Sequence, residues 1–243
     1  MILKRDLIIP DVHCPNHDKR ALRLVEKVGQ QFEFDTVICL GDLIDNEPLG
    51  RHPKTYKKKL DYSADVKSAR AVRARLEALA PKRIITLGNH DEWFNKYFAE
   101  RAPEFNLDEN NIAKLLGLDN WTVIPYKKYY KHGKVYISHD FERCGKYAAQ
   151  QVLADVQNSV YFGHTHRLVA AYEGDVFGNR HVSANFGWLG DVNKITYKHM
   201  LKAKREWQLG FGICYREPNG VCHTQLVPII AYKCVVEGVL FKA

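Results

Sequence analysis

The feature that most constrains the fold of this 243-residue chain is a set of five short apolar runs, each of which leads into a group of polar residues. The runs are residues 7–9, 37–40, 84–87, 135–137 and 160–162. Short apolar runs bounded by turn-forming residues are typical of buried strands. Because ligands of open α/β sheets bind at the carboxyl ends of the strands, we expect the polar residues to meet in one crevice.

The polar residues are of the types that bind divalent metal ions. They occur as Asp11-Val12-His13, Gly41-Asp42-Leu43-Ile44-Asp45, Gly88-Asn89-His90-Asp91, the single His139, and Gly163-His164-Thr165-His166. Carboxylate, imidazole and amide groups suit Mn, Fe or Zn. None of the five motifs contains a cysteine, which argues against a structural zinc site. Residues two positions apart in an extended chain point to the same side, so each such pair could hold one metal centre. Two pairs have this spacing, Asp11 with His13 and His164 with His166.

Each motif taken alone has a simpler explanation. A Gly-Asp pair usually forms a turn, Gly-Asn-His-Asp can begin a helix as its N-cap, and a single histidine is more often packed in a core than bound to metal. Five strand-end motifs with compatible ligand chemistry are hard to produce by chance. We therefore interpret the set as one catalytic metal site.

The motif set resembles that of the calcineurin-like metallophosphoesterase superfamily, and the resemblance covers about residues 7–167. It implies an α/β fold, a four-layer αββα sandwich of two mixed β-sheets flanked by helices. It also implies two divalent metal ions. One ion would be bound by Asp11, His13 and His166, the other by Asn89, His139 and His164, and Asp42 would bridge them.

The resemblance implies further roles for residues that do not bind metal. His90 would contact the scissile phosphate or protonate the leaving oxygen, and Asp45 would orient His90. Asp91 is a candidate for a supporting role. Protein serine/threonine phosphatases of the superfamily have an arginine directly after the second aspartate of the Gly-Asp motif, and this chain has Asn46 there. That difference argues against a protein phosphatase.

The length fits a single domain over residues 1–243, with core motifs in 7–167 and a strand-rich part in 168–243. No apolar run is long enough to span a bilayer and no signal-peptide pattern occurs, so we expect a cytoplasmic protein with no membrane partner. The six cysteines are scattered, with no C-x-x-C pair, and are expected to be buried free thiols. Cys14 lies beside the predicted site and could be sensitive to oxidation.

Apolar residues recur at helical spacing in residues 18–30 and 63–79, which predicts helices there and βαβ units in the first part of the chain. The turn Pro218-Asn219-Gly220 predicts a hairpin between residues 212–216 and 221–227. We expect the strands after the last polar motif to form a second, largely antiparallel sheet. A terminal sheet leaves an edge that could pair in a homo-oligomer.

The formal net charge of +8 is compatible with a polyanionic partner or simply with a solvated surface. Basic and aromatic residues alternate in 51–59, 126–134 and 194–205, and such segments can bind phosphate backbones and stack on bases. A solvated basic face explains them equally well. Arg51 and His52 closely follow the second motif, so they are candidate substrate contacts.

Residues 46–61 and 94–120 are expected to be loops, which would leave a compact, open site. We predict a phosphoesterase that uses metal-activated water, with Mn as the favoured metal and Fe, Zn, Ni or Co as alternatives. The substrate would be a nucleotide or nucleic-acid phosphate. A phosphomonoesterase acting on nucleoside 5'-monophosphates is favoured, and the alternative is a phosphodiesterase that cuts DNA or RNA. A binding or scaffold protein with the same fold but no turnover is the third class.

Overall fold

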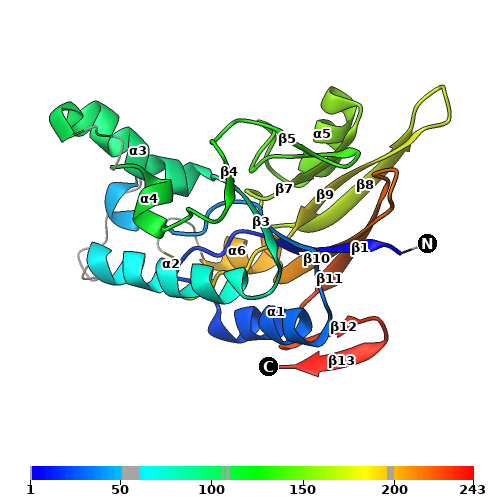
Figure 1. Ribbon diagram of the computed structural model, residues 1–243, viewed down its shortest axis with the longest axis horizontal. Coiled ribbons are helices and arrows are strands. Elements are labelled where there is room, and N and C mark those ends of the chain that lie inside the picture. The colour runs from blue at the N-terminus through cyan, green and yellow to red at the C-terminus, as the bar shows by residue number, and fades with distance from the viewer. Residues whose placement is uncertain (1, 51–60, 106, 108–109, 196–199) are drawn as a thin grey trace.

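The computed structural model describes residues 2–50, 61–105, 107, 110–195 and 200–243. It contains two large β-sheets with helices outside them (Figure 1). Arg51 and His52, and the basic segment 51–59, lie outside the described residues. Among the helices that the structure describes, none is both long and apolar enough to cross a membrane.

The first sheet has the strand order β11-β10-β1-β2-β3-β4. Its strands are β1 (Lys4–Ile9), β2 (Thr36–Cys39), β3 (Lys82–Thr86), β4 (Thr122–Ile124), β10 (Gly210–Arg216) and β11 (Cys222–Pro228). Strands β1 to β4 are parallel, whereas β10 and β11 are antiparallel to their neighbours. The parallel part confirms the predicted βαβ units, because a helix connects β1 to β2 and another connects β2 to β3.

The second sheet has the order β5-β6-β7-β9-β8. Its strands are β5 (Tyr130–His132), β6 (Val135–Ile137), β7 (Ser159–Phe162), β8 (Leu168–Gly174) and β9 (Arg180–Phe186). The central strands β6, β7 and β9 are parallel, and the two edge strands are antiparallel. A separate two-stranded sheet near the C-terminus pairs β12 (Lys233–Val236) with β13 (Val239–Lys242).

The helices are α1 (Lys19–Gln31), α2 (Tyr62–Glu77), α3 (Asn89–Arg101), α4 (Ile112–Leu116), α5 (Ala148–Val156) and α6 (Met200–Glu206), with short 3-10 turns η1 (Glu47–Leu49) and η2 (Pro103–Phe105). Helices α1 and α2 cover the outer face of the first sheet, and α5 covers that of the second. The α1 and α2 helices confirm the helices predicted from apolar spacing. Helix α1 begins after Asp18, whose side chain accepts hydrogen bonds from the backbone N of Arg20 and Ala21.

Successive side chains of a strand point to opposite faces of the sheet, so each face contributes to a separate core between the layers. In β1, Leu7 and Ile9 pack with apolar residues of α1 and α2, whereas Ile8 packs between the sheets with Tyr161 and Phe186. A third cluster fills the space between the second sheet and α5. Helix, sheet, sheet and helix therefore form the four layers expected from the motif resemblance.

Two expectations about the elements are wrong. The strands after the last polar motif do not form one antiparallel sheet: the predicted hairpin is present as β10 and β11, but β10 pairs with β1 and so extends the first sheet. The strands β8 and β9 extend the second sheet, which is mixed. Residues 94–120 are not a loop, because α3 continues to Arg101 and α4 begins after Asn111, whose side chain accepts a hydrogen bond from the backbone N of Lys114.

Candidate metal centre

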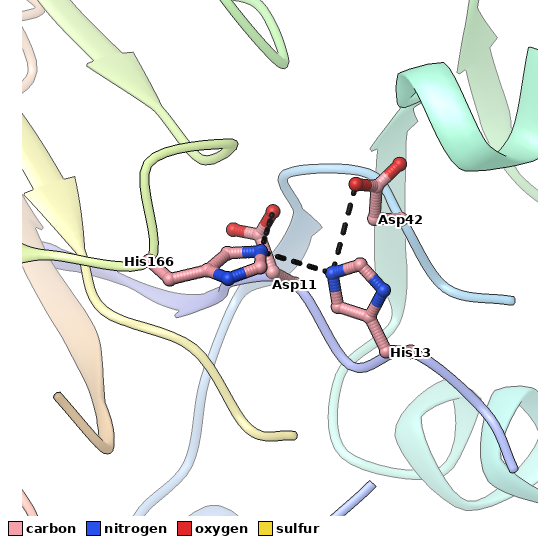
Figure 2. A group of neighbouring side chains, drawn as sticks. All are labelled: Asp11, His13, Asp42 and His166. Carbon is pink, nitrogen blue, oxygen red and sulfur yellow. Dashed lines mark hydrogen bonds and ion pairs between the residues drawn. The ribbon is translucent and has the colours of Figure 1, made fainter. Parts of the chain in front are cut away.

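The predicted polar motifs follow the carboxyl ends of five strands, β1, β2, β3, β6 and β7, and meet at one edge of the sandwich. Within this site Asp11, His13, Asp42 and His166 form the first group of potential ligands. One ligand atom from each lies within 4.8 Å of the others, and Figure 2 shows the four side chains converging. The two ring atoms His13 Nε2 and His166 Nε2 are 3.0 Å apart.

A second group forms around Asn89. Its Oδ1 lies 3.1 Å from His139 Nε2 and 2.8 Å from His164 Nδ1. Asp42 belongs to both groups, since its Oδ2 is 3.6 Å from His13 Nε2 and 3.4 Å from His139 Nε2. These contacts bring together the residues of the two ligand sets that the resemblance implies, with one carboxylate oxygen facing both. Asp140, which was not predicted, also offers a ligand atom near His139 and His164.

The first group contains buried carboxylates that fit a cation. Asp11 Oδ2 has no hydrogen-bond partner among the described residues. Burial, and then the charge of Asp42, raises the pKa of Asp11 well above its usual value. The second oxygen of each carboxylate is held by backbone: His164 N donates to Asp11 Oδ1 at 2.8 Å and His90 N donates to Asp42 Oδ1 at 2.9 Å. Two buried carboxylates beside several imidazoles fit a dinuclear divalent metal site.

Glycines provide the space for these carboxylates. A Cβ atom at Gly88 would overlap Asp42 Oδ1, and one at Gly163 would overlap Asp11 Oδ2. The glycines of the third and fifth motifs are therefore required by the close approach of backbone to carboxylate.

The two-residue spacing within the first and fifth motifs was expected to reflect an extended chain, and this expectation is wrong. His13, Asp42, His164 and His166 have φ values of 55°, 48°, 67° and 58°, so they adopt the left-handed conformation and are not extended. As a result His164 and His166 face different groups. Asp11 and His13 do share a group, but with His13 in the left-handed conformation and not through alternation along a strand.

Contacts with the second ring nitrogen orient the imidazoles. His139 Nδ1 donates to the backbone oxygen of Leu40 at 2.7 Å, which leaves Nε2 to face Asp42 and Asn89. The indole of Trp188 stacks on His166 with a centroid distance of 4.9 Å and an interplanar angle of 13°. Trp188 was not predicted, because nothing in the local sequence distinguishes a tryptophan that supports a ligand from one that fills a core.

Burial also favours the neutral form of two imidazoles. It lowers the pKa of His164 to about 4 and lowers the pKa of His166 well below its usual value. Metal binding requires an unprotonated ring nitrogen. Both rings are therefore in the binding form at neutral pH.

Asp45 holds two histidines with one oxygen. Its Oδ1 is 3.0 Å from His13 Nδ1 and 2.9 Å from His90 Nδ1, and Asn16 Nδ2 donates to its Oδ2. Burial raises the pKa of Asp45, but the hydrogen bonds to His13 and His90 outweigh it and hold the pKa below the usual range. Burial lowers the pKa of His90, but the charges of Asp42 and Asp45 raise it to about 9. Asn16 was not predicted, because it belongs to none of the five motifs.

Two further polar residues stabilise the loops around His90. Asp91 accepts hydrogen bonds from the backbone N of Gly88 at 2.8 Å and of Ile44 at 3.3 Å, which joins the start of α3 to the second motif. Burial raises the pKa of Asp91 to about 7. Asn46, at the position of the protein-phosphatase arginine, is buried and donates to the backbone oxygen of His90 at 2.8 Å. This position therefore supports the loop.

Cys14 does not have the environment of an oxidation-sensitive thiol. Its side chain is fully buried, and burial raises its pKa above the usual value. Because the thiolate is the reactive form, this environment protects the sulfur. The four cysteines Cys14, Cys39, Cys214 and Cys234 are buried free thiols, whereas Cys144 is exposed.

Partly exposed aromatic rings lie next to His90 and next to the second group of ligands. The ring centroid of Trp93 is 4.0 Å from that of His90, and the ring centroid of Tyr126 is 6.3 Å from that of His139. Both aromatic residues are partly exposed. The first residue of the predicted basic segment 126–134 is thus close to the second group.

Residues 5–197 of this chain match a sequence family described as "Calcineurin-like phosphoesterase". The chain belongs to this family. It is therefore a metal-dependent hydrolase that acts on phosphate esters. It is similar to the Gene 54 proteins of Mycobacterium phages D29 and L5, with 26% identity to each and 97% of both chains covered in each comparison. Vacuolar Protein Sorting 29 from Cryptosporidium parvum shares the fold, with a TM-score of 0.52, 14% identity and 100% of both chains covered.

Proposed function

We propose that this phosphoesterase is a phosphomonoesterase that hydrolyses nucleoside 5'-monophosphates. The observation that carries the proposed reaction is the position of Asp42 Oδ2, which faces the rings of His13 and His139 at 3.6 and 3.4 Å. A carboxylate shared between two ligand groups suits a pair of metal ions that act on one phosphate.

Each of the two groups of side chains is proposed to bind one metal ion. One ion would be held by Asp11, His13 and His166, the other by Asn89, His139 and His164, and Asp42 would contact both. Mn is the favoured metal, and Fe, Zn, Ni or Co suit the same nitrogen and oxygen donors. When bound, two divalent ions supply Lewis acidity that withdraws charge from phosphate oxygens and makes water nucleophilic at neutral pH.

His90 is the proposed proton donor to the leaving oxygen. Its Nδ1 contacts Asp45, so the proton would pass through Nε2. The charges of Asp42 and Asp45 favour the protonated ring, which is the form that can donate. Asp45 acts as a positioning residue, because it touches the ring of His90 and not the substrate.

The partly exposed rings beside the ligands support a nucleotide as the substrate. Trp93 packs on His90 and Tyr126 lies near His139, so a phosphate between the two groups would place its ester group close to aromatic surface. Base stacking on an aromatic side chain is worth about 1–3 kcal/mol and tolerates any base. Arg51 and His52 are proposed as further substrate contacts, on their sequence position alone.

A phosphodiesterase that cuts DNA or RNA is the second candidate, and the basic segment near His139 supports it. Lys127 and Lys128 are exposed next to Tyr126. Lysines at this position could contact phosphates on either side of a scissile bond. A mononucleotide has no such neighbouring phosphates.

The deciding experiment offers the metal-reconstituted protein two substrates, a mixture of nucleoside 5'-monophosphates and an end-labelled linear DNA, with Asp42→Asn as the blank. Free phosphate from the mononucleotides with intact DNA is the expected result. Shortened DNA without free phosphate would overturn the monoesterase in favour of the nuclease. Hydrolysis of neither, but of a small chromogenic ester, would exclude both nucleotide substrates.

We further propose a cytoplasmic location and a homo-oligomer formed through the C-terminal strands. The hairpin of β12 and β13 has apolar side chains on its surface. Val235 is 52% exposed, Val239 44% and Leu240 52%. Such surface fits self-association. Size-exclusion chromatography with light scattering tests the oligomer, and a strict monomer would contradict it.

A further inference from the structure

A second cavity, of about 620 Å³, lies at the opposite end of the second sheet from the metal centre. It is lined by the first residues of β6, β7 and β9, including Val135, Ser159 and Arg180. The metal-centre residues follow the last residues of β6 and β7. Five positions separate Ser159 from His164, which corresponds to about 16 Å of extended chain. The cavity is therefore distinct from the catalytic crevice.

The cavity is strongly basic. Lys131, Lys134 and Arg180 line it, together with His181 and His223, and no aspartate or glutamate contributes to the lining. In the part of the chain that the structure describes, no carboxylate forms an ion pair with Lys131, Lys134 or Arg180. Three cations without an ion-pair partner around one cavity favour an anionic ligand.

Nearby carboxylates are already engaged with other groups. Asp6 is fully buried and accepts a hydrogen bond from Arg216 Nε at 2.9 Å. Glu217 lies 2.8 Å from His223 Nε2. Asp175 accepts hydrogen bonds within its own turn, including one from the backbone N of Phe177 at 2.9 Å. Asp175 Oδ2 also lies 3.5 Å from His181 Nε2, so Asp175 and Glu217 pair with the histidines of the lining and not with its lysines or arginine.

The backbone holds the cavity in shape. The turn before β6 contacts the turn between β10 and β11, where Lys134 N donates to the backbone oxygen of Gly220 at 2.8 Å. This contact joins the two sheets beside the cavity. Aromatic surface is also available: Tyr172 is 69% exposed, and Lys131 Nζ lies 5.4 Å from the ring centroid of Tyr136.

We propose that this cavity binds a nucleotide unit, with its phosphate among Lys131, Lys134 and Arg180 and its base against Tyr172 or Tyr136. The volume lies in the range of about 300–1,000 Å³ that is usual for small-molecule sites. Cations combined with aromatic rings are the usual chemistry of base and phosphate recognition. The unit is either a free nucleotide or one residue of a single strand, and the two sources share this chemistry.

The test uses metal-loaded protein and two probes that resist hydrolysis. One is the methylenephosphonate analogue of AMP, and the other is a fluorescein-labelled hexathymidylate with phosphorothioate linkages. The double variant Lys134→Glu/Arg180→Glu removes the proposed site. The double variant Arg23→Glu/Lys67→Glu changes the net charge equally on exposed positions of α1 and α2, so it is the matched control.

Calorimetry with the AMP analogue should show one binding site fewer in the cavity variant than in the control variant, if the ligand is a free nucleotide. If the ligand is a strand, the affinity for the oligonucleotide should fall at least about tenfold in the cavity variant and less than about twofold in the control. Either result supports the site. Equal behaviour of the two variants with both probes would overturn it.

Turnover of p-nitrophenyl phosphate reports folding and the metal centre in the same samples. Both double variants should retain the wild-type rate, because neither changes a residue of the catalytic crevice. The comparison measures binding and not hydrolysis of nucleotides. A failure of the proposed monophosphatase activity would therefore leave this test intact.

Discussion

Asp45 links a side chain of the metal groups to the proposed proton donor. One oxygen, Oδ1, contacts His13 at 3.0 Å and His90 at 2.9 Å, and Asn16 donates to the other. Groups that orient a metal ligand through its second ring nitrogen also set its tautomer and basicity. We therefore expect changes at Asp45 and at His90 to have different consequences.

For Asp45→Asn, we predict a metal affinity about 10–100-fold lower, together with a lower rate. The amide is neutral, so it no longer favours a donating Nδ1 on His13 and a basic Nε2. Titration of the metal-free protein against a chelator of known affinity measures the effect. Asp119→Asn, on the exposed surface, is the control. Wild-type metal affinity in Asp45→Asn would mean that this carboxylate does not support His13.

For His90→Ala, we predict that both metal ions are retained and that the rate falls about 100-fold or more. The ring would be lost as a proton donor, while the backbone N that donates to Asp42 Oδ1 remains. Elemental analysis of the purified variant, combined with its rate on a phosphate ester, tests both parts. Loss of metal from His90→Ala would show that the ring has a ligand role.

At the level of elements, β1 carries charged residues at both ends. Asp11 and His13 follow it, and near its start Asp6 lies between β10 and the second sheet. Asp6 is fully buried and is contacted by Arg216 at 2.9 Å and by His132 at 2.8 Å. A buried charge with two basic partners joins strands from both sheets.

This contact predicts a loss of stability in acid. Burial raises the pKa of Asp6, but hydrogen bonds from His132 and Arg216 outweigh burial and lower it below the usual value. The stabilisation is therefore present above the unfolded pKa of about 3.9 and is lost as the pH falls through the folded pKa. Urea unfolding of wild type and Asp6→Ala should differ by about 3–5 kcal/mol at pH 7 and by less in acid. A difference independent of pH would contradict this assignment.

Strand ends could be predicted from the sequence, but the partners of several strands could not. The apolar run at residues 7–9 and the motif after it are local, so β1 and its polar end are recognisable. The pairing of Leu7 with Ile213 joins residues about 200 positions apart and leaves no local signal. For the same reason the sequence predicts the hairpin of β10 and β11 but not the sheet that contains it.

The motifs predict that their polar side chains meet in one crevice, but the arrangement of those side chains could not be predicted. Left-handed turns at His164 and His166 separate two histidines that strand alternation would have placed together. Trp188 and Asn16 support the site through contacts across the fold, with His166 and Asp45 respectively. Such contacts depend on packing that a single sequence does not reveal.

At the level of the whole molecule, the two sheets meet so that their strand ends supply different parts of one site. Strands of the first sheet lead into Asp11, Asp42 and Asn89. Strands of the second sheet lead into His139 and His164. The core between the sheets contains Ile8 and Phe186, which fixes their relative position. The metal centre therefore depends on the packing of the whole sandwich, with Asp42 at the point where the two ligand groups join.

The bridging role of Asp42 is tested by the metal content and phosphoesterase rate of Asp42→Asn beside wild type. Wild type should bind two divalent ions per chain. Asp42→Asn should lose at least one of them and most of its rate, because its Oδ2 lies 3.6 Å from His13 and 3.4 Å from His139. If Asp42→Asn keeps two ions per chain and the wild-type rate, Asp42 does not bridge a catalytic metal pair.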